Sequence, residues 1–376
     1  MAILELIRTA LMKAPQDLFV VNTYMGFIAT LLGVIGAPDS PMDIPTTLKE
    51  LKIVLSHPKC DKLQVVHTGI QIWFKLFEDP ELQRRLFEEE REAELTRMTP
   101  HQAYLKGLIS GAFRNICLDP FFLHALGEVA VPFPQLERIL SPFRTAILAL
   151  KPNQERDFES LSPFIYALSL QSLKNNYLWD IKEEEKVMID NYRNEIKNML
   201  NDITTSAPNG ILSKSLLHHL SIYSMFHPLS DFENIEELVL SLNLDKLPPQ
   251  LVTLFNKSIL ATAEEIDIKQ EIIALTPIPD SDLLQYFDSH ITTFWDSPPL
   301  TCLSKVSLAD ELEWRYPYFQ GNFNKNDKLK VLIAACGSGR EVYQVYSTYK
   351  NVEITAIDYS ETNLAYAIRQ NRVCGI

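Results

Sequence analysis

Apolar residues recur at helical spacing through most of the first 316 residues of the chain. One example is the set Leu105, Leu108, Ile109 and Ala112, which would lie on one face of a helix. Pro-containing breaks, most of them with Asn, Asp or Ser, interrupt this pattern, and such breaks are typical of turns between helices. They occur at residues 38–41, 132–134, 151–153 and 277–280. The pattern therefore predicts a stack of short helices from residue 1 to about residue 316.

The pattern changes after residues 321–327, a turn-rich segment that we interpret as a linker. Residues 329–335 form a short apolar run that predicts a strand buried on both faces, and residues 352–357 predict a second strand. Residues 340–350 between them have helical spacing, and Ser360 is placed to cap a further helix that runs to about residue 372. Strands that alternate with helices are typical of the start of a doubly wound α/β domain. The predicted fold is therefore mainly α, followed by the first βαβα half of a Rossmann-like domain.

The same end of the chain carries the most informative chemical pattern. Residues 335–339, with the sequence ACGSG, follow the first predicted strand, and Asp358 follows the second. Glycines permit the tight turn between a strand and a helix, and the free amides at the start of that helix attract a carboxylate or a phosphate. An acid at the tip of the second strand can accept hydrogen bonds from both hydroxyl groups of a ribose. Together these features predict an adenosine site at the carboxyl edge of a parallel sheet. The alternative is a generic turn in which the glycines serve only the backbone.

The spacing of the glycines distinguishes between cofactors. A dinucleotide site needs G-x-G-x-x-G, and Val342 at the third glycine position disfavours a nicotinamide-dependent enzyme. The spacing Ala335-x-Gly337-x-Gly339 instead resembles the glycine motif of class I S-adenosylmethionine-dependent methyltransferases. Residues 358–367, with the sequence DYSETNLAYA, are similar to that family's stretch after the second strand. Two positions depart from the family pattern: Ala335 replaces the first glycine, and Ile333 replaces an acidic residue that is common within the first strand.

This resemblance implies S-adenosylmethionine as the cofactor. It implies that Ala335, Gly337 and Gly339 line the methionine part and that Asp358 holds the ribose. The predicted cofactor-binding set also includes the adjoining Ser338 and Tyr359. The family's sheet has seven strands, and its acceptor-side residues usually follow the fourth, whereas this sequence supplies two strands. We therefore assign no catalytic side chain, and we expect a fragment or a C-terminally truncated chain with an incomplete catalytic domain.

The helical region resembles that of a particular group within the methyltransferases. Residues 120–150, 168–185 and 274–278 are similar to the helices that precede the catalytic domain in bacterial methyltransferases fused to tetratricopeptide repeats. The resemblance implies degenerate tetratricopeptide-like helices at 1–36, an all-helical region at 37–320 and the N-terminal part of a Rossmann-like methyltransferase domain at 321–376. On this interpretation, residues 18–33 form a repeat helix packed on its neighbours. The alternative is a membrane span over residues 18–37, which carry no charge, but acidic or Pro-rich segments flank this stretch instead of Lys/Arg clusters.

Net charge and cysteine content indicate which partners and which cellular compartment to expect. The chain has 48 Asp and Glu against 35 Lys and Arg, and its net charge of -13 argues against nucleic acid as a partner. Its five cysteines are far apart and odd in number, which fits free thiols in a reducing compartment and hence a cytoplasmic protein. His57, Cys60 and His67 lack a second Cys pair at zinc spacing, so we predict no metal site.

Residues 314–316 shortly before the first strand also have two interpretations. We expect Trp314 and Tyr316 to pack in a core or a cap, because large aromatic side chains usually do. The alternative is that Arg315 meets the methionine carboxylate. Neither interpretation changes the cofactor that the resemblance implies.

We therefore interpret the chain as part of an S-adenosylmethionine-dependent methyltransferase. The methyl acceptor is open among protein, small molecule and lipid, with nucleic acid and membrane partners not expected. A protein partner that binds the helical region is a further expectation. The alternative is a non-catalytic helical protein-interaction module that carries a remnant of a nucleotide-binding fold.

Overall fold

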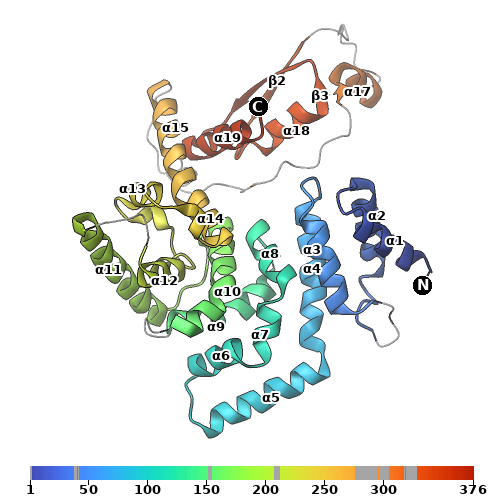
Figure 1. Ribbon diagram of the computed structural model, residues 1–376. Helices are drawn as coiled ribbons and strands as arrows, with labels where there is room; N and C mark the ends of the chain where they lie inside the picture. Colours follow the sequence, from blue (N-terminus) through green and yellow to red (C-terminus); the bar gives the residue numbers. More distant parts are fainter. Residues whose placement is uncertain are drawn as a thin grey trace. The chain divides into compact units, whose positions relative to one another are not determined.

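The computed structural model describes residues 2–37, 40, 42–131, 133–150, 155–206, 212–275, 295, 305–316, 318 and 328–376. These residues are mostly helical, which confirms the mainly α prediction (Figure 1). The chain forms two compact units, Met1–Leu260 and Ala261–Ile376. The division falls inside the region predicted as all-helical, because the helix at Ala261–Leu275 belongs to the second unit. The predicted linker at 321–327 and the predicted turns at 151–153 and 277–280 lie outside the described residues.

The first unit is built from short helices joined by tight turns. Its α-helices are α1 (Ala2–Lys13), α2 (Leu18–Leu31), α3 (Ile44–Leu55), α4 (Lys62–Phe74), α5 (Pro80–Leu95), α6 (Pro100–Ile109), α7 (Ala112–Cys117), α8 (Pro120–Glu128), α9 (Pro134–Leu148), α10 (Glu155–Lys174), α11 (Glu183–Ser206), α12 (Lys214–Tyr223), α13 (Ile235–Leu240) and α14 (Pro249–Phe255). Short 3-10 turns lie at η1 (Lys75–Glu78), η2 (Leu229–Asp231) and η3 (Leu244–Lys246), and a π turn lies at η4 (Asn256–Leu260).

The starts of several helices follow from local sequence. Asp79 and Asp119 each precede a proline, and each carboxylate accepts a hydrogen bond from a backbone N–H of the first helical turn. The proline needs no partner for an N–H there and already has the helical φ angle, so Asp-Pro is a strong start signal. Thr99 begins α6 with a reciprocal pair of hydrogen bonds to Gln102. These caps explain why the first unit forms many short helices.

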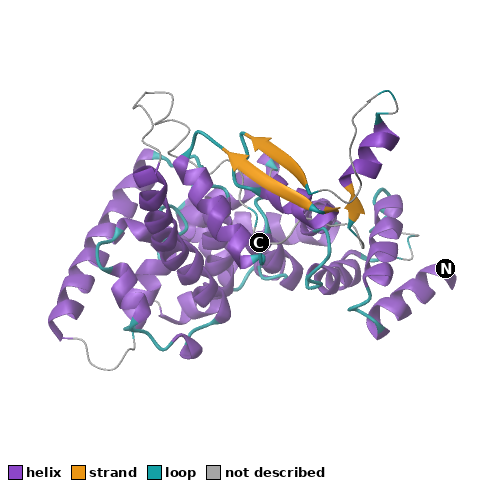
Figure 2. Cartoon of the chain, turned by 90° about the horizontal axis from the view of Figure 1, so that it is seen from above, coloured by secondary structure: helices purple, strands orange, loops and turns teal. Residues whose placement is uncertain are grey.

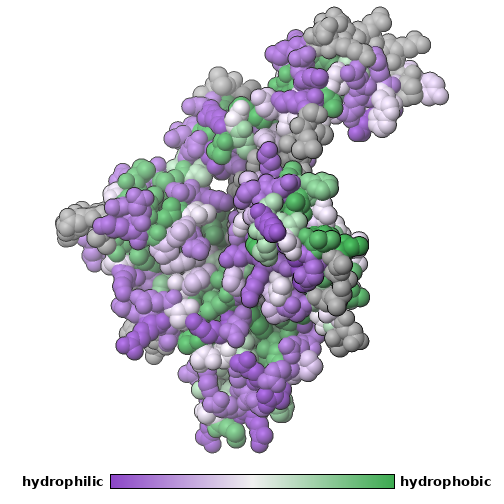
Figure 3. Space-filling view, turned by 45° about the vertical axis from the view of Figure 1, so that its right-hand side comes forward, coloured by the Kyte–Doolittle hydropathy of each residue, from purple (hydrophilic) through white to green (hydrophobic). Residues whose placement is uncertain are grey.

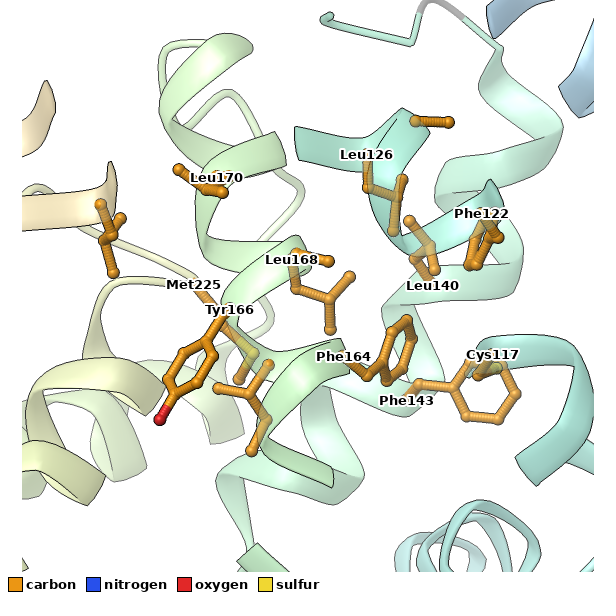
Figure 4. Close-up of a cluster of buried hydrophobic side chains, with 14 of the residues drawn as sticks. Cys117, Phe122, Leu126, Leu140, Phe143, Phe164, Tyr166, Leu168, Leu170 and Met225 are labelled. Carbon is orange, nitrogen blue, oxygen red and sulfur yellow. The ribbon is translucent and has the colours of Figure 1, made fainter. Parts of the chain in front are cut away.

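Aromatic and aliphatic side chains from α4, α8, α9 and α10 form the centre of the first unit. Trp73 of α4 stacks on Phe122 of α8 with ring centroids 4.0 Å apart. The ring of Phe164 on α10 lies 6.4 Å from that of Phe122 and 6.3 Å from that of Phe143 on α9. Figure 4 shows Phe143, Phe164 and Leu168 within this cluster. Burial of these large rings contributes to the stability of the unit.

Helix α2 contains most of the uncharged stretch for which a membrane span was the alternative. Val21, Tyr24, Met25 and Ile28 of this helix are buried, and α1 packs against it. Within the described ranges, none of the helices combines the length and the apolar character that crossing a bilayer requires. In the space-filling view, hydrophilic residues cover much of the visible face, with smaller hydrophobic groups between them (Figure 3). Helix packing in α2 agrees with the predicted repeat-like helix, but the tetratricopeptide resemblance itself stays a prediction.

The second unit contains two small parallel sheets and four described helices. Its elements in chain order are α15 (Ala261–Leu275), β1 (Val306–Ser307), α17 (Leu308–Arg315), β2 (Leu329–Ala334), α18 (Arg340–Thr348), β3 (Tyr349–Lys350), β4 (Val352–Ile357) and α19 (Glu361–Val373). Strands β2 and β4 pair in parallel, with Leu329 opposite Val352 and Ala334 opposite Ile357 (Figure 2). Strands β1 and β3 form the second parallel pair. Both predicted strands are therefore present and parallel, and the Rossmann-like fold stays a prediction.

The prediction of a strand buried on both faces is wrong. Burial alternates along β2 and along β4, so that one face of the pair is partly buried and the other is exposed. Leu332 is 63% exposed and Ile357 is 50% exposed. Helix α18 packs against β4 and also against α19. Among the described residues nothing covers the opposite face, and an apolar run alone did not reveal this.

Candidate functional site

The turn between β2 and α18 has an unusual backbone. Ala335, Gly337 and Gly339 all have positive φ angles, at 55°, 51° and 77°. The N–H of Gly339 donates to the carbonyl of Cys336 at 2.9 Å, which closes the turn directly before α18. Glycine adopts such φ angles readily, whereas a residue with a Cβ atom is strained by about 1–2 kcal/mol. The sequence pattern therefore matches the backbone at the two glycines, and Ala335 occupies a strained position.

Asp358 lies directly against this turn. One oxygen of its carboxylate, Oδ2, accepts a hydrogen bond from the N–H of Gly337 at 2.7 Å. The other oxygen, Oδ1, accepts from the N–H of Ser360 at 2.9 Å. Gly337 and Asp358 are brought together because β2 and β4 are parallel neighbours whose carboxyl ends meet at one sheet edge. The structure thus joins the two parts of the pattern that the sequence singled out.

The opposite side of the turn packs closely on α19. A Cβ atom added to Gly339 would lie 2.6 Å from the Cβ of Ala367 and 2.7 Å from Nδ2 of Asn371. Asn371 also donates from Nδ2 to the carbonyl of Gly339 at 3.3 Å. Glycine is therefore required at position 339 for two independent reasons, the φ angle and the close approach of α19. This approach fixes the place where α18 begins.

Trp295 is a residue of this region that sequence reasoning missed. Its indole N–H donates to the carbonyl of Ser338 at 2.7 Å, although the two residues are 43 positions apart in the chain. The side chain of Ser338 is buried as well, since the residue is 5% exposed. No local signal marks Trp295, because a lone Trp without periodic apolar neighbours has no distinguishing pattern. Only the tertiary structure brings it to the turn.

The electrostatic character of the turn comes from its backbone. Helix α18 has nine residues, and Gly339 at its start provides no side chain to cap the first amides. Uncapped amides at a helix start carry partial positive charge and favour an anionic group. Burial and the nearby charge of Asp358 raise the pKa of the Cys336 thiol to about 11, so this cysteine is protonated at neutral pH and is no nucleophile. The turn therefore combines partial positive charge at the start of α18 with a protonated Cys336 thiol and the carboxylate of Asp358.

Of the remaining residues considered in the sequence, Tyr359 adjoins the turn, whereas Trp314, Arg315 and Tyr316 lie at the end of α17. Tyr359 follows Asp358 directly and is 75% exposed. The expected packing of Trp314 and Tyr316 is wrong, because these residues are 79% and 58% exposed at the end of α17. Arg315 forms an ion pair with Glu311 of the same helix, with 2.7 Å between Nε and Oε1. Ala335, Gly337, Ser338, Gly339 and Asp358 therefore form one local site, with Tyr359 at its edge.

The histidines and cysteine considered for metal binding have other surroundings. His57 Nε2 lies 3.2 Å from the carbonyl of Gln16, and its Nδ1 accepts from the N–H of Lys59 at 3.1 Å. Burial raises the pKa of the Cys60 thiol to about 11. The part of the chain that the structure describes contains no group of three or more His, Cys, Asp or Glu placed to hold a metal ion.

Comparisons of the chain with protein-family models, with curated proteins and with solved structures found no match.

Proposed function

We propose that the second unit binds S-adenosylmethionine and that the protein is an S-adenosylmethionine-dependent methyltransferase. The observation that carries this proposal is the 2.7 Å hydrogen bond between the N–H of Gly337 and the carboxylate of Asp358. It supports a common site because the glycine turn and the acid after the second strand are the two elements that the family resemblance assigns to one cofactor. Their separation would have removed the basis for the proposal.

The residues at the turn fit the two ends of this cofactor. The positive φ angles of Ala335, Gly337 and Gly339 keep the turn compact beside the start of α18, where a carboxylate is favoured. Each oxygen of Asp358 accepts one backbone N–H, and a carboxylate oxygen has a second lone pair. Asp358 therefore retains acceptor capacity for the hydroxyl groups of a ribose. The bound cofactor would supply an electrophilic methyl group on a positively charged sulfur.

A dinucleotide fits less well than this cofactor. Val342 stands where a dinucleotide turn needs its third glycine. The third glycine of a dinucleotide turn allows helix and strand to approach closely. Here the close approach is made by Gly339, at the second glycine position, and its partner is α19. These two observations support a nucleoside without a pyrophosphate. Under this proposal the unit belongs to the Rossmann-like methyltransferase folds.

The proposal also covers the partner of the helical unit and the cellular compartment. We place the methyl acceptor among proteins, small molecules and lipids, and we assign the helical unit to contacts with a protein partner. Support for the cytoplasm comes from Cys60, Cys117, Cys336 and Cys374, which are free thiols. The rival function is a helical interaction module without catalysis. It would share the protein partner and the compartment, but it would bind no cofactor and have no methyl acceptor.

The test is isothermal titration calorimetry of the full chain with S-adenosylhomocysteine, the product form of the cofactor. We expect a dissociation constant in the micromolar range. Asp358→Asn keeps the size of the side chain and removes its charge, so it should weaken binding by about 1–3 kcal/mol through the loss of charge-assisted hydrogen bonds. Glu353→Gln is the matched control, because Glu353 is an exposed carboxylate on β4, the strand that Asp358 follows.

The controls separate the two functions. Wild-type protein that binds neither S-adenosylhomocysteine nor S-adenosylmethionine contradicts the proposal and favours the interaction module. Binding that Asp358→Asn leaves unchanged means that the ribose is held elsewhere. Binding of NADH in place of the sulfur compounds would favour the nicotinamide-dependent alternative.

A further inference from the structure

Trp295 is held in place by α19 and reaches the glycine turn with its side chain. It is 6% exposed. Its backbone N–H donates to the hydroxyl oxygen of Tyr366 at 2.9 Å, and the Tyr366 hydroxyl donates to the Trp295 carbonyl at 2.9 Å. Its ring lies 5.8 Å from the ring of Tyr343 on α18. Tyr366 therefore fixes the backbone of Trp295, and the indole N–H bonds to Ser338.

Side-chain contacts orient two backbone carbonyl groups of the turn. The carbonyl of Ser338 is directed towards the Trp295 indole, and the carbonyl of Gly339 towards Asn371. Because a trans peptide unit is planar, its N–H is directed opposite to its carbonyl. The N–H of Arg340 is therefore directed away from Asn371. Carbonyl oxygens repel an anion, so bonding both from behind keeps two repulsive groups away from the ligand side of the turn, while the N–H of Gly339 itself donates to the Cys336 carbonyl.

We propose that Trp295 is a positioning residue for cofactor binding. Its indole N–H holds the Ser338 carbonyl in the orientation in which the turn accepts the carboxylate end of the cofactor. This inference rests on the proposed binding of S-adenosylmethionine, and it adds a residue that neither the glycine motif nor the acid after the second strand includes. Trp295 makes no contact with the cofactor in this role.

The test compares Trp295→Phe with Trp314→Phe in the full chain. Phenylalanine keeps an aromatic ring at position 295 and removes the N–H donor, whereas Trp314 is 79% exposed and makes a matched control. We expect Trp295→Phe to weaken S-adenosylhomocysteine binding by about 5- to 10-fold, the effect of one hydrogen bond to a buried carbonyl. Trp314→Phe should bind as the wild type does.

Hydrogen exchange separates positioning from a structural role, and fluorescence reports whether the ligand binds beside Trp295. Ligand binding at the turn should change the tryptophan fluorescence of the wild type and of Trp314→Phe, and the change should be absent in Trp295→Phe. Hydrogen exchange of α18 and β4 in the absence of ligand should be the same in all three proteins. A purely structural role would instead raise this exchange in Trp295→Phe, whereas the fluorescence change is lost with the indole in either case.

Each outcome decides one of the two proposals. A wild type that binds no cofactor overturns the proposed function. A wild type that binds, together with Trp295→Phe of equal affinity, overturns the role of Trp295. If Trp295→Phe fails to fold, Tyr366→Phe replaces it, because this variant keeps the indole and removes the hydroxyl that holds its backbone. We expect Tyr366→Phe to weaken binding several-fold, and an unchanged affinity would overturn the role of Trp295.

Discussion

Replacement of Gly339 by alanine tests how the glycine turn is held against α19. The new methyl group would lie 2.6 Å from the Cβ of Ala367, and φ at this position is 77°. The left-handed backbone costs an alanine about 1–2 kcal/mol. Forcing an extra methyl group into a packed contact costs about 1–3 kcal/mol more. We therefore expect Gly339→Ala to lower the stability of the turn and its neighbours by about 2–5 kcal/mol.

Gly375→Ala is the control that separates the two contributions. Its φ of 83° is almost the same, but a Cβ atom at this position meets nothing within 4 Å. It should therefore show only the backbone contribution of about 1–2 kcal/mol. The difference between the two variants, about 1–3 kcal/mol, measures the contact with α19 alone.

Hydrogen exchange followed by mass spectrometry is the suitable assay, because it gives the free energy of local opening without requiring the whole chain to unfold in one step. Peptides that cover α18 and β4 report on the turn, and peptides that cover the end of α19 report on Gly375. Equal loss of protection in the two variants would refute the close packing of the turn on α19. Wild-type protection in Gly339→Ala would refute the conformation of the turn as well.

Three further predictions concern the stability of the two units. Asp358→Ala removes the acceptor for two backbone N–H groups, so exchange at residues 335–340 should report a loss of about 2–4 kcal/mol, and unchanged exchange would contradict these bonds. Glu50→Ala leaves the guanidinium of Arg8 without its buried partner at 2.8 Å and should lower the free energy of unfolding in urea by about 3–5 kcal/mol. The exposed Glu5 lies 3.9 Å from the same arginine, and Glu5→Ala should change the free energy of unfolding by at most about 0.5 kcal/mol. Similar effects of the two variants would refute the buried pair. Gly69→Ala should destabilise the first unit in thermal unfolding, because a Cβ atom there collides with Phe121, whereas Gly26→Ala meets nothing within 4 Å and should stabilise α2 by about 0.5–1 kcal/mol. A stabilising Gly69→Ala would show that the contact between α4 and α8 is looser than the structure has it.

Local signals in the sequence predicted most elements at the carboxyl end of the chain closely. The helix expected at 340–350 is the exception, because it ends at Thr348 and Tyr349–Lys350 form β3. The second strand was expected at 352–357, where β4 lies, and the first strand differs from β2 by one residue. Ser360 was expected to begin a helix, and its hydroxyl accepts from the N–H of Asn363 at the start of α19. These features are encoded within a few residues, as caps, turns and apolar runs. The proximity of Gly337 and Asp358 followed from them, because parallel strands bring their carboxyl ends together.

The contacts that support the turn were decided by the tertiary structure. Arg369 of α19 pairs with Glu265 of α15 at 2.7 Å, across 104 positions of the chain. This ion pair lies within the second unit, although the sequence pattern placed Glu265 in the all-helical region at 37–320. Trp295 and the exposed face of β2 and β4 had no sequence signal either. Periodicity shows that a segment has an apolar face, but not which distant segment will cover it. The sequence alone thus determined the local elements and the place of the glycine turn, whereas long-range packing decided the boundary of the units and the side chains that hold the turn.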